Sequence, residues 1–309
     1  MKKCNSCNAV LRDEALFCSF CGSSELSPLT QPRQVCSSSS PFKALLKALL
    51  CAVIFLGTQL AVTFVYLLVA TIFISSGTHL TADELSWMLS DMLTQHAPII
   101  SIISNILTVA LFAIYFLLRH RKLHHELGMR RCPFILIPLC AVLGYALQYV
   151  IVIITMLLPW PEEWLTSHAE STSAAMTGGL LLIILSTSVI TAFSEETVFR
   201  AISMEHLGRA FGCVATVIIS AVIFGAAHLS PIAMFYATVL GIIIGAIYRR
   251  FRSVWPCITV HLFFNLAATL GLPSSSLLLY LSIVAISFGV SIIAIYLILA
   301  RIDARAEIH

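Results

Sequence analysis

Long apolar segments constrain this chain more than any other feature of its sequence. A transmembrane helix needs about 20 mostly apolar residues to cross a hydrocarbon core of roughly 30 Å. Segments of about this length, a few of them shorter, begin near Ala44, Ala97, Pro133, Gly179, Cys213, Pro231, Val254 and Ser276. Only 11% of the 309 residues are charged, whereas soluble domains carry about 25%. We therefore predict an all-α, polytopic membrane protein with about eight transmembrane helices.

The charged residues indicate how these helices are oriented, because cytoplasmic loops collect lysine and arginine. No apolar export signal is visible in the first forty residues, so we expect a plasma-membrane protein with a cytoplasmic N-terminus. Alternating the eight segments from there places the C-terminus and all 18 basic residues on the cytoplasmic side, among them Arg119, Arg121, Lys122, Arg130, Arg131, Arg200, Arg209, Arg249, Arg250, Arg252, Arg301 and Arg305. The expected outer loops carry acidic residues and interfacial tryptophans instead, namely Asp83, Glu84, Asp91, Glu162 and Glu163, with Trp87, Trp160 and Trp164. The net charge of +3 is too small for a nucleic-acid surface, so no such partner is expected.

Two C-x-x-C pairs precede the first apolar segment. Cys4 and Cys7 form one pair, and Cys18 and Cys21 form the other. Two such turns aim four thiolates at one tetrahedral zinc ion, which supplies the folding energy of a segment too short for a hydrophobic core. The pattern resembles the minimal zinc ribbons of bacterial membrane proteins; chance pairs or a redox dithiol are the alternative. We expect a zinc ribbon at 1–24, a flexible linker at 25–42 and a membrane domain at 43–309.

Three polar clusters interrupt the apolar segments, and such residues are costly inside a bilayer unless they serve a function. The first cluster, at the end of the fourth segment, contains Glu195, Glu196 and Arg200, with Glu196 and Arg200 on one helix face. Its alternative reading is a helix end whose charges meet water. The second runs from Phe224 to His228, with small residues that let another helix approach closely; its alternative reading is a structural histidine at a helix end. The third pairs His261 with Asn265, one helical turn apart, and its alternative reading is a polar bridge between helices.

Together the three clusters supply the groups of a hydrolytic site. A carboxylate can activate water, imidazoles can hold a metal or polarise a carbonyl, and an amide can stabilise an oxyanion. Helix geometry raises one difficulty. A fifth helix that starts at Cys213 carries His228 toward the far leaflet, at about 1.5 Å per residue, whereas Glu195 lies near the cytoplasmic one. Either the glutamate helix starts shallower or the fifth helix is tilted and begins outside the membrane.

The three clusters, in this order, resemble the CAAX-protease and bacteriocin-processing (CPBP, or Abi) family of intramembrane proteases. Its pattern of E-E-x-x-x-R, F-x-x-x-H and H-x-x-x-N is present between about Gly179 and Leu270. The resemblance implies an endopeptidase of membrane-associated proteins or peptides, of the CAAX type or in bacteriocin or immunity processing. It implies Glu195 as the base that activates water and Glu196 and Arg200 as its supporting pair. His228, His261 and Asn265 would complete the site.

Three questions stay open at this point. His228, His261 and Glu195 could hold a catalytic zinc with one open position, but the family has also been read as metal-free, and the H-E-x-x-H zinc motif is absent. The chain could instead be a non-proteolytic scaffold or immunity protein that keeps the fold, or a small-solute transporter, although no internal repeat is visible. The zinc ribbon, with no open metal position, is expected to bind a protein partner or to regulate access to the site.

Overall fold

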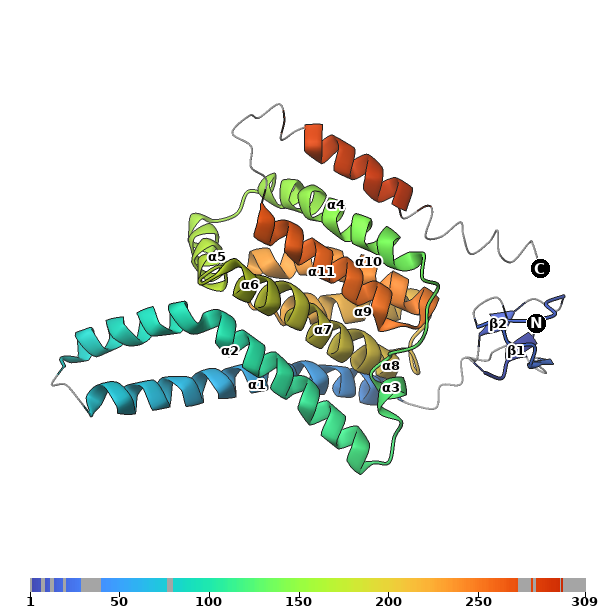
Figure 1. Ribbon diagram of the computed structural model, residues 1–309, viewed down its shortest axis with the longest axis horizontal. Helices are drawn as coiled ribbons and strands as arrows, with labels where there is room; N and C mark the ends of the chain where they lie inside the picture. Colours follow the sequence, from blue (N-terminus) through green and yellow to red (C-terminus); the bar gives the residue numbers. More distant parts are fainter. Residues whose placement is uncertain are drawn as a thin grey trace.

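The computed structural model describes residues 2–6, 9–11, 14–18, 21–28, 40–76, 80–271 and 282–294, together with Leu279 and Tyr296. Most of this is helix (Figure 1). Among these residues, five helices are long and apolar enough to cross a membrane: α1 (Pro41–Ser75), α2 (Ala82–Leu118), α4 (Leu136–Met156), the composite helix Leu180–Leu207 and α10 (Pro231–Phe251). Three further apolar helices are shorter: α9 (Cys213–Ala226), which precedes α10, and α11 (Val254–Leu270) and Ser282–Ala294, which follow it. The all-α, polytopic membrane fold is confirmed, with eight apolar helices in the described part of the chain.

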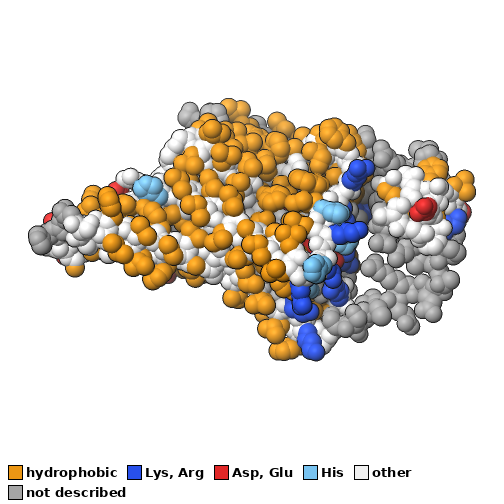
Figure 2. Space-filling model, turned by 60° about the horizontal axis from the view of Figure 1, so that its bottom comes forward, with side chains coloured by type: hydrophobic (Ala, Val, Ile, Leu, Met, Phe, Trp, Pro, Cys, Tyr) orange, Lys and Arg blue, Asp and Glu red, His pale blue; other side chains and the backbone are white. Residues whose placement is uncertain are grey.

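The surface of the helical body explains why this fold needs a bilayer. Large apolar side chains lie exposed along its length, such as Phe64, Phe73, Leu118 and Phe134, which are 65 to 85% accessible. Figure 2 shows hydrophobic side chains over most of one face, with lysine, arginine and histidine gathered in a band at one end. Exposure of this extent is expected of a surface that faces lipid. The band of basic residues matches the asymmetry that the sequence predicted.

The α1–α2 hairpin differs from the prediction, because α2 begins at Ala82 rather than near Ala97. Thr81 and Glu84 form a capping box there: each side chain accepts a hydrogen bond from the other residue's backbone N–H. At about 1.5 Å per residue, α2 is roughly 55 Å long, so the hairpin projects beyond the other helices (Figure 1). Asp83, Glu84 and Asp91, expected in a loop, therefore lie in the first turns of this helix.

Small residues let the central helices approach closely. A Cβ atom at Gly144 of α4 would collide with the backbone carbonyl of Val260 in α11, and one at Gly225 of α9 would collide with the hydroxyl of Thr238 in α10. Glycine at such crossings brings helix backbones into contact. The close approach that the small residues before His228 predicted is therefore confirmed, with α10 as the partner of α9.

Two further elements lie outside the central helices. The expected outer loop around Glu162 and Glu163 forms α5 (Glu162–Ala175), and α3 (Leu123–Glu126) is a single turn in the loop after α2.

The N-terminal module is a three-stranded antiparallel sheet of order β2-β1-β3, made of β1 (Lys2–Cys4), β2 (Val10–Leu11) and β3 (Leu26–Pro28). Its last strand lies beyond residue 24, inside the segment expected to be linker, and α1 begins at Pro41, two residues before the expected boundary.

Candidate active site

The glutamate cluster lies in the middle of a composite helix, well before its end. This helix runs through α6 (Leu180–Ile183), η1 (Ile184–Ile190), α7 (Thr191–Glu195), η2 (Glu196–Ser203) and α8 (Met204–Leu207), and both η segments are π-helical. π-Helical turns are rare and concentrate at functional sites. Glu196 and Arg200 are fully buried and Glu195 is 7% exposed. The alternative reading, charges that meet water at a helix end, is therefore wrong, and Arg200 lies inside the helical body rather than in the basic band.

Glu196 contacts two of the other candidate site residues. One of its carboxylate oxygens, Oε2, lies 3.2 Å from Nε of Arg200, one turn further along the helix. The other, Oε1, accepts a hydrogen bond of 2.8 Å from Nδ1 of His261 in α11. A carboxylate can only accept, so Nδ1 carries the proton, and this fixes both the tautomer and the orientation of the ring.

The opposite nitrogen of His261 faces the second glutamate. Nε2 lies 3.8 Å from Oε2 of Glu195, too far for a direct hydrogen bond. Within the described residues, Oε2 of Glu195 is buried and makes no hydrogen bond. The π-helical turn that starts at Glu196 is wider than an α-helical one, so neighbouring residues diverge less around the axis. Two adjacent carboxylates can consequently face the two nitrogens of one imidazole.

Phe224 of α9 is the packing centre of the site, and the sequence did not single it out as a site residue. The guanidinium carbon of Arg200 lies 4.3 Å from the centre of its ring. The imidazoles of His228 and His261 meet the same ring at centroid distances of 5.0 and 5.9 Å, both edge to face. The Phe224 ring thus contacts both histidines and offers a cation–π contact to a buried arginine. The F-x-x-x-H spacing was its only signal in the sequence.

His228 lies two residues beyond the end of α9, in the turn to α10. Its Nδ1 donates to the backbone carbonyl of Phe224 over 3.0 Å, which leaves Nε2 for other partners. The next residue, Leu229, has a φ of 60°, a left-handed conformation that is costly for a bulky side chain and is found where a tight turn is enforced. Tyr236 of α10 lies at a centroid distance of 6.5 Å from His228. Nothing in the sequence pointed to Tyr236.

Helix length resolves the difficulty over depth. The composite helix continues for 12 residues past Glu195, to Leu207, which amounts to about 18 Å. Helix α9 has only 14 residues, about 21 Å, and stops before His228. Counted from the same end of the molecule, Glu195 and His228 therefore lie at similar depths. Neither predicted explanation is needed, because α9 is too short to cross the bilayer.

Asn265 lies one turn beyond His261 on α11 and connects that helix to the composite helix. Its side-chain amide donates a hydrogen bond of 2.8 Å to the backbone carbonyl of Thr187, in η1. This satisfies a carbonyl in a π-helical segment, where the regular α-helical bonds are displaced. The predicted bridge between two helices is thus present. One amide proton is used in this bond, and the second is left for another acceptor.

The two candidate metal sites differ in their geometry. The sulfurs of Cys4, Cys18 and Cys21 lie within 4.8 Å of one another, with Cys4 and Cys21 at 3.5 Å. Zinc–sulfur bonds of about 2.3 Å place the sulfurs of a tetrahedral site roughly 3.8 Å apart, so these three cysteines fit zinc. Cys7, the fourth predicted ligand, is outside the described residues. Among the residues described, Glu195, His228 and His261 do not form such a group.

The comparisons with known proteins concern the same part of the chain. Residues 177–267 match the family model of the type II CAAX prenyl endopeptidase Rce1-like proteins. Neither a curated protein nor a solved structure matches the chain. The match begins just before the composite helix and ends two residues after Asn265, so it contains all three polar clusters. The segment 177–267 is therefore Rce1-like, and the resemblance to the CAAX-protease and bacteriocin-processing family is confirmed over this part of the chain.

Proposed function

We propose that the protein is an intramembrane endopeptidase that hydrolyses a peptide bond of a membrane-associated protein or peptide, with Glu195 as the base that activates water. The observation that carries this proposal is the geometry around Glu195. Its buried carboxylate has one oxygen without a hydrogen-bond partner in the described residues, 3.8 Å from a histidine nitrogen whose orientation Glu196 fixes. A single water molecule can bond to both groups across that distance.

Each residue of the cluster then has a defined task. Glu195 takes a proton from water as the oxygen attacks the scissile carbonyl carbon, and returns it to the leaving amine nitrogen when the carbon–nitrogen bond breaks. His261 orients the water through Nε2, while Glu196 fixes the His261 tautomer and compensates the charge of Arg200. The remaining amide proton of Asn265 donates to the developing oxyanion, whereas Nε2 of His228, whose ring proton is on Nδ1, can only accept a hydrogen bond, such as one from a backbone N–H of the substrate. No step requires a metal. Among the described residues, the possible ligand atoms of Glu195, His228 and His261 do not lie close enough together to form a metal-binding group, which favours a metal-free mechanism.

The Rce1-like match supports the choice of substrate. It suggests proteins that carry a prenyl group on a cysteine near the C-terminus, cleaved after that cysteine. Bacteriocin or immunity peptides, which the resemblance to the wider family implies, are the other substrate class. The basic band lies at one end of the helical body (Figure 2), so we assign that end to the cytoplasm. Glu195 then lies about 18 Å from the cytoplasmic end of its helix.

Removing the base tests the proposal. We expect Glu195→Gln to abolish cleavage of a prenylated C-terminal peptide, or of a membrane-proteome peptide library, by the purified protein in nanodiscs. The substitution keeps the shape of the side chain and removes its basicity, so cleavage should fall by at least 100-fold. Glu163→Gln, which changes an exposed carboxylate of α5, serves as the matched control and should cleave like the parent. Equal products from all three proteins would leave a non-proteolytic scaffold as the better description.

A further inference from the structure

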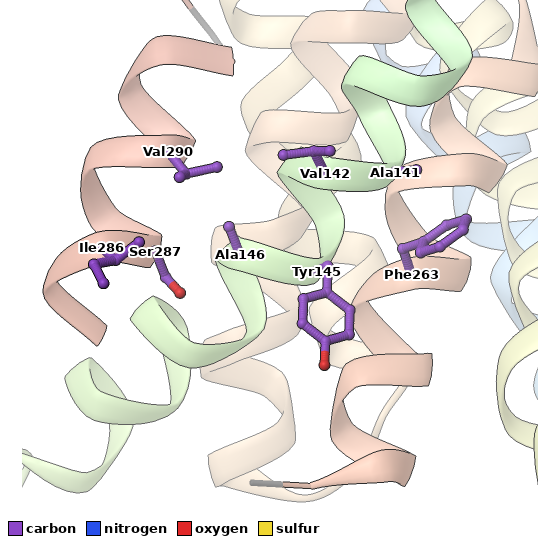
Figure 3. A pocket seen from close by; sticks show the side chains of 8 residues that line it. All are labelled: Ala141, Val142, Tyr145, Ala146, Phe263, Ile286, Ser287 and Val290. Carbon is purple, nitrogen blue, oxygen red and sulfur yellow. The ribbon is translucent and has the colours of Figure 1, made fainter. Parts of the chain in front are cut away.

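Two hollows in the helical body lie apart from the candidate active site, and they differ in chemistry. The first, of about 400 Å³, lies between α4, α11 and Ser282–Ala294. Figure 3 shows it lined by Val142, Ala146, Ile286 and Val290, with Tyr145 and Phe263 along one side. None of its lining residues is charged, so it carries no electrostatic signal for a particular ligand. The second, of about 700 Å³, carries charges and is called the basic cavity below.

The basic cavity is formed by α1, α2, the α3 loop and the last turns of the composite helix. Its apolar wall consists of Leu50, Cys51, Ile54, Leu111, Phe112, Tyr115, Phe116, Ala201 and Ile202. Leu50 is 54% exposed, Leu111 44% and Tyr115 53%, so this wall continues into the apolar surface of the molecule. Its polar rim consists of Lys47, Arg119, Arg121, His125, Glu126, Arg130, Glu205, His206 and Arg209.

The charges of this rim do not balance. Glu126 pairs with Arg121 at 2.8 Å, and Glu205 pairs with Arg252, outside the rim, at 2.7 Å. Both rim carboxylates are thus already engaged. In the described part of the chain, the four other lysines and arginines of the rim, Lys47, Arg119, Arg130 and Arg209, have no carboxylate within ion-pair distance.

The rim histidine beside Arg130 does not add to this excess of positive charge. Nη2 of Arg130 lies 3.1 Å from Nε2 of His125. An arginine can only donate, so this nitrogen of His125 accepts. Partial burial, and then the Arg130 charge, lower the pKa of His125. The ring is consequently neutral near pH 7, and the rim keeps a surplus of fixed positive charge contributed by three different elements.

We propose that the basic cavity binds an anionic phospholipid of the adjacent leaflet. Its phosphate lies between Lys47, Arg119 and Arg209, and one acyl chain runs along Leu50 and Leu111 toward the lipid-facing surface. Basic pockets between transmembrane helices are suited to anionic headgroups, and arginine offers two parallel N–H donors to phosphate oxygens. The apolar wall continuous with the rim argues for an amphiphile rather than a soluble anion. This site is independent of the proposed peptidase activity.

Lipid binding to the purified, delipidated full chain tests this proposal. Native mass spectrometry would count bound phosphatidylglycerol, with phosphatidylcholine and glycerol 3-phosphate as comparison probes. The variant Lys47→Gln/Arg119→Gln/Arg209→Gln should bind phosphatidylglycerol at least tenfold more weakly than the parent. The matched control is Lys43→Gln/Arg131→Gln/Arg250→Gln. It removes the same net charge from three exposed residues outside the cavity and should bind like the parent.

A second variant keeps the proposal testable if the triple variant unfolds. Leu50→Trp leaves every charge in place and obstructs the apolar wall at an exposed position, so it should also weaken phosphatidylglycerol binding at least tenfold. Equal losses in the two triple variants would reduce the effect to general surface charge and overturn the proposal. Equal binding of phosphatidylcholine would overturn it as well. Glycerol 3-phosphate bound as tightly as the lipid would identify a soluble-anion site instead.

Discussion

At the scale of single residues, Glu195 and Glu196 are adjacent in sequence but do different work. Glu196 is the only carboxylate that the described structure places against the fully buried Arg200. Removing one partner of a buried ion pair typically costs about 3–5 kcal/mol, because it leaves a desolvated charge uncompensated. We therefore expect Glu196→Gln to lower the thermal unfolding midpoint of the detergent-purified protein by several degrees. Glu195→Gln should leave the midpoint within about a degree of the parent.

The matching rescue is Glu196→Gln/Arg200→Met, which removes both charges together. Replacing a whole buried pair by groups of similar size is often neutral or stabilising, so the double variant should recover much of the lost midpoint. If Glu195→Gln unfolded as readily as Glu196→Gln, the division between a reactive carboxylate and a structural one would be wrong.

The six candidate residues were predicted from their motifs, because each motif is short and its spacing does not depend on tertiary structure. The structure brings Glu195, Glu196, Arg200 and His261 into one buried cluster, linked to His228 through Phe224. The pairing of both carboxylates with one imidazole could not be foreseen. It depends on the π-helical turns of η2, and no composition rule for single sequences signals them. Tyr236 enters the site only through the packing of α10, which the sequence left unspecified.

At the scale of helices, the close crossing of α4 and α11 positions the histidine of the site. Val260 precedes His261 on α11, and its carbonyl occupies the space that a side chain at Gly144 would need. Gly144→Ala must therefore separate the two helices. Overpacking typically costs about 1–3 kcal/mol, so we expect a lower unfolding midpoint. Proteolytic activity should also fall, since His261 moves with α11.

Gly57 of α1 is the matched control for that substitution. An added Cβ atom there meets nothing within 4 Å, and alanine in a helix interior is favoured over glycine by about 0.5–1 kcal/mol. Gly57→Ala should thus leave the unfolding midpoint unchanged or raise it, with full activity. Equal midpoints for both alanine variants would show that the α4–α11 crossing relaxes without cost.

Hydropathy predicted the order and positions of the helices better than their ends. All eight predicted segments correspond to apolar helices, but α2 starts 15 residues before the predicted Ala97. The signal for the true start was the capping box of Thr81 and Glu84, which a search for bilayer-length apolar runs does not register. The end of α9 was misjudged as well, since hydropathy does not indicate that this helix ends at Ala226, 14 residues from its start.

At the scale of the whole molecule, the chain combines a membrane-embedded body with a small module whose stability has a different origin. The apolar core of the N-terminal sheet contains Cys4, Leu11 and Cys18, flanked by Ala9, Ala15 and Leu26. A core of this size rarely supports folding alone, and structural zinc supplies the missing free energy in such modules. We propose that Cys7 completes the thiolate set of Cys4, Cys18 and Cys21, and that the module recruits a partner or controls access.

The zinc content of the protein and of its variants tests whether the metal is bound by the N-terminal module or by the membrane-embedded site. The purified chain should contain one zinc ion per molecule by elemental analysis. Cys18→Ser should reduce that content substantially, because it removes one of the clustered sulfurs, whereas Glu195→Gln and His261→Ala should retain the full amount. Chelation should leave the unfolding midpoint of the helical body unchanged, since its core contains none of these cysteines. A second equivalent of zinc that is lost on His261→Ala would instead place a metal in the membrane site, and Glu195 would then act as a ligand rather than as a base alone.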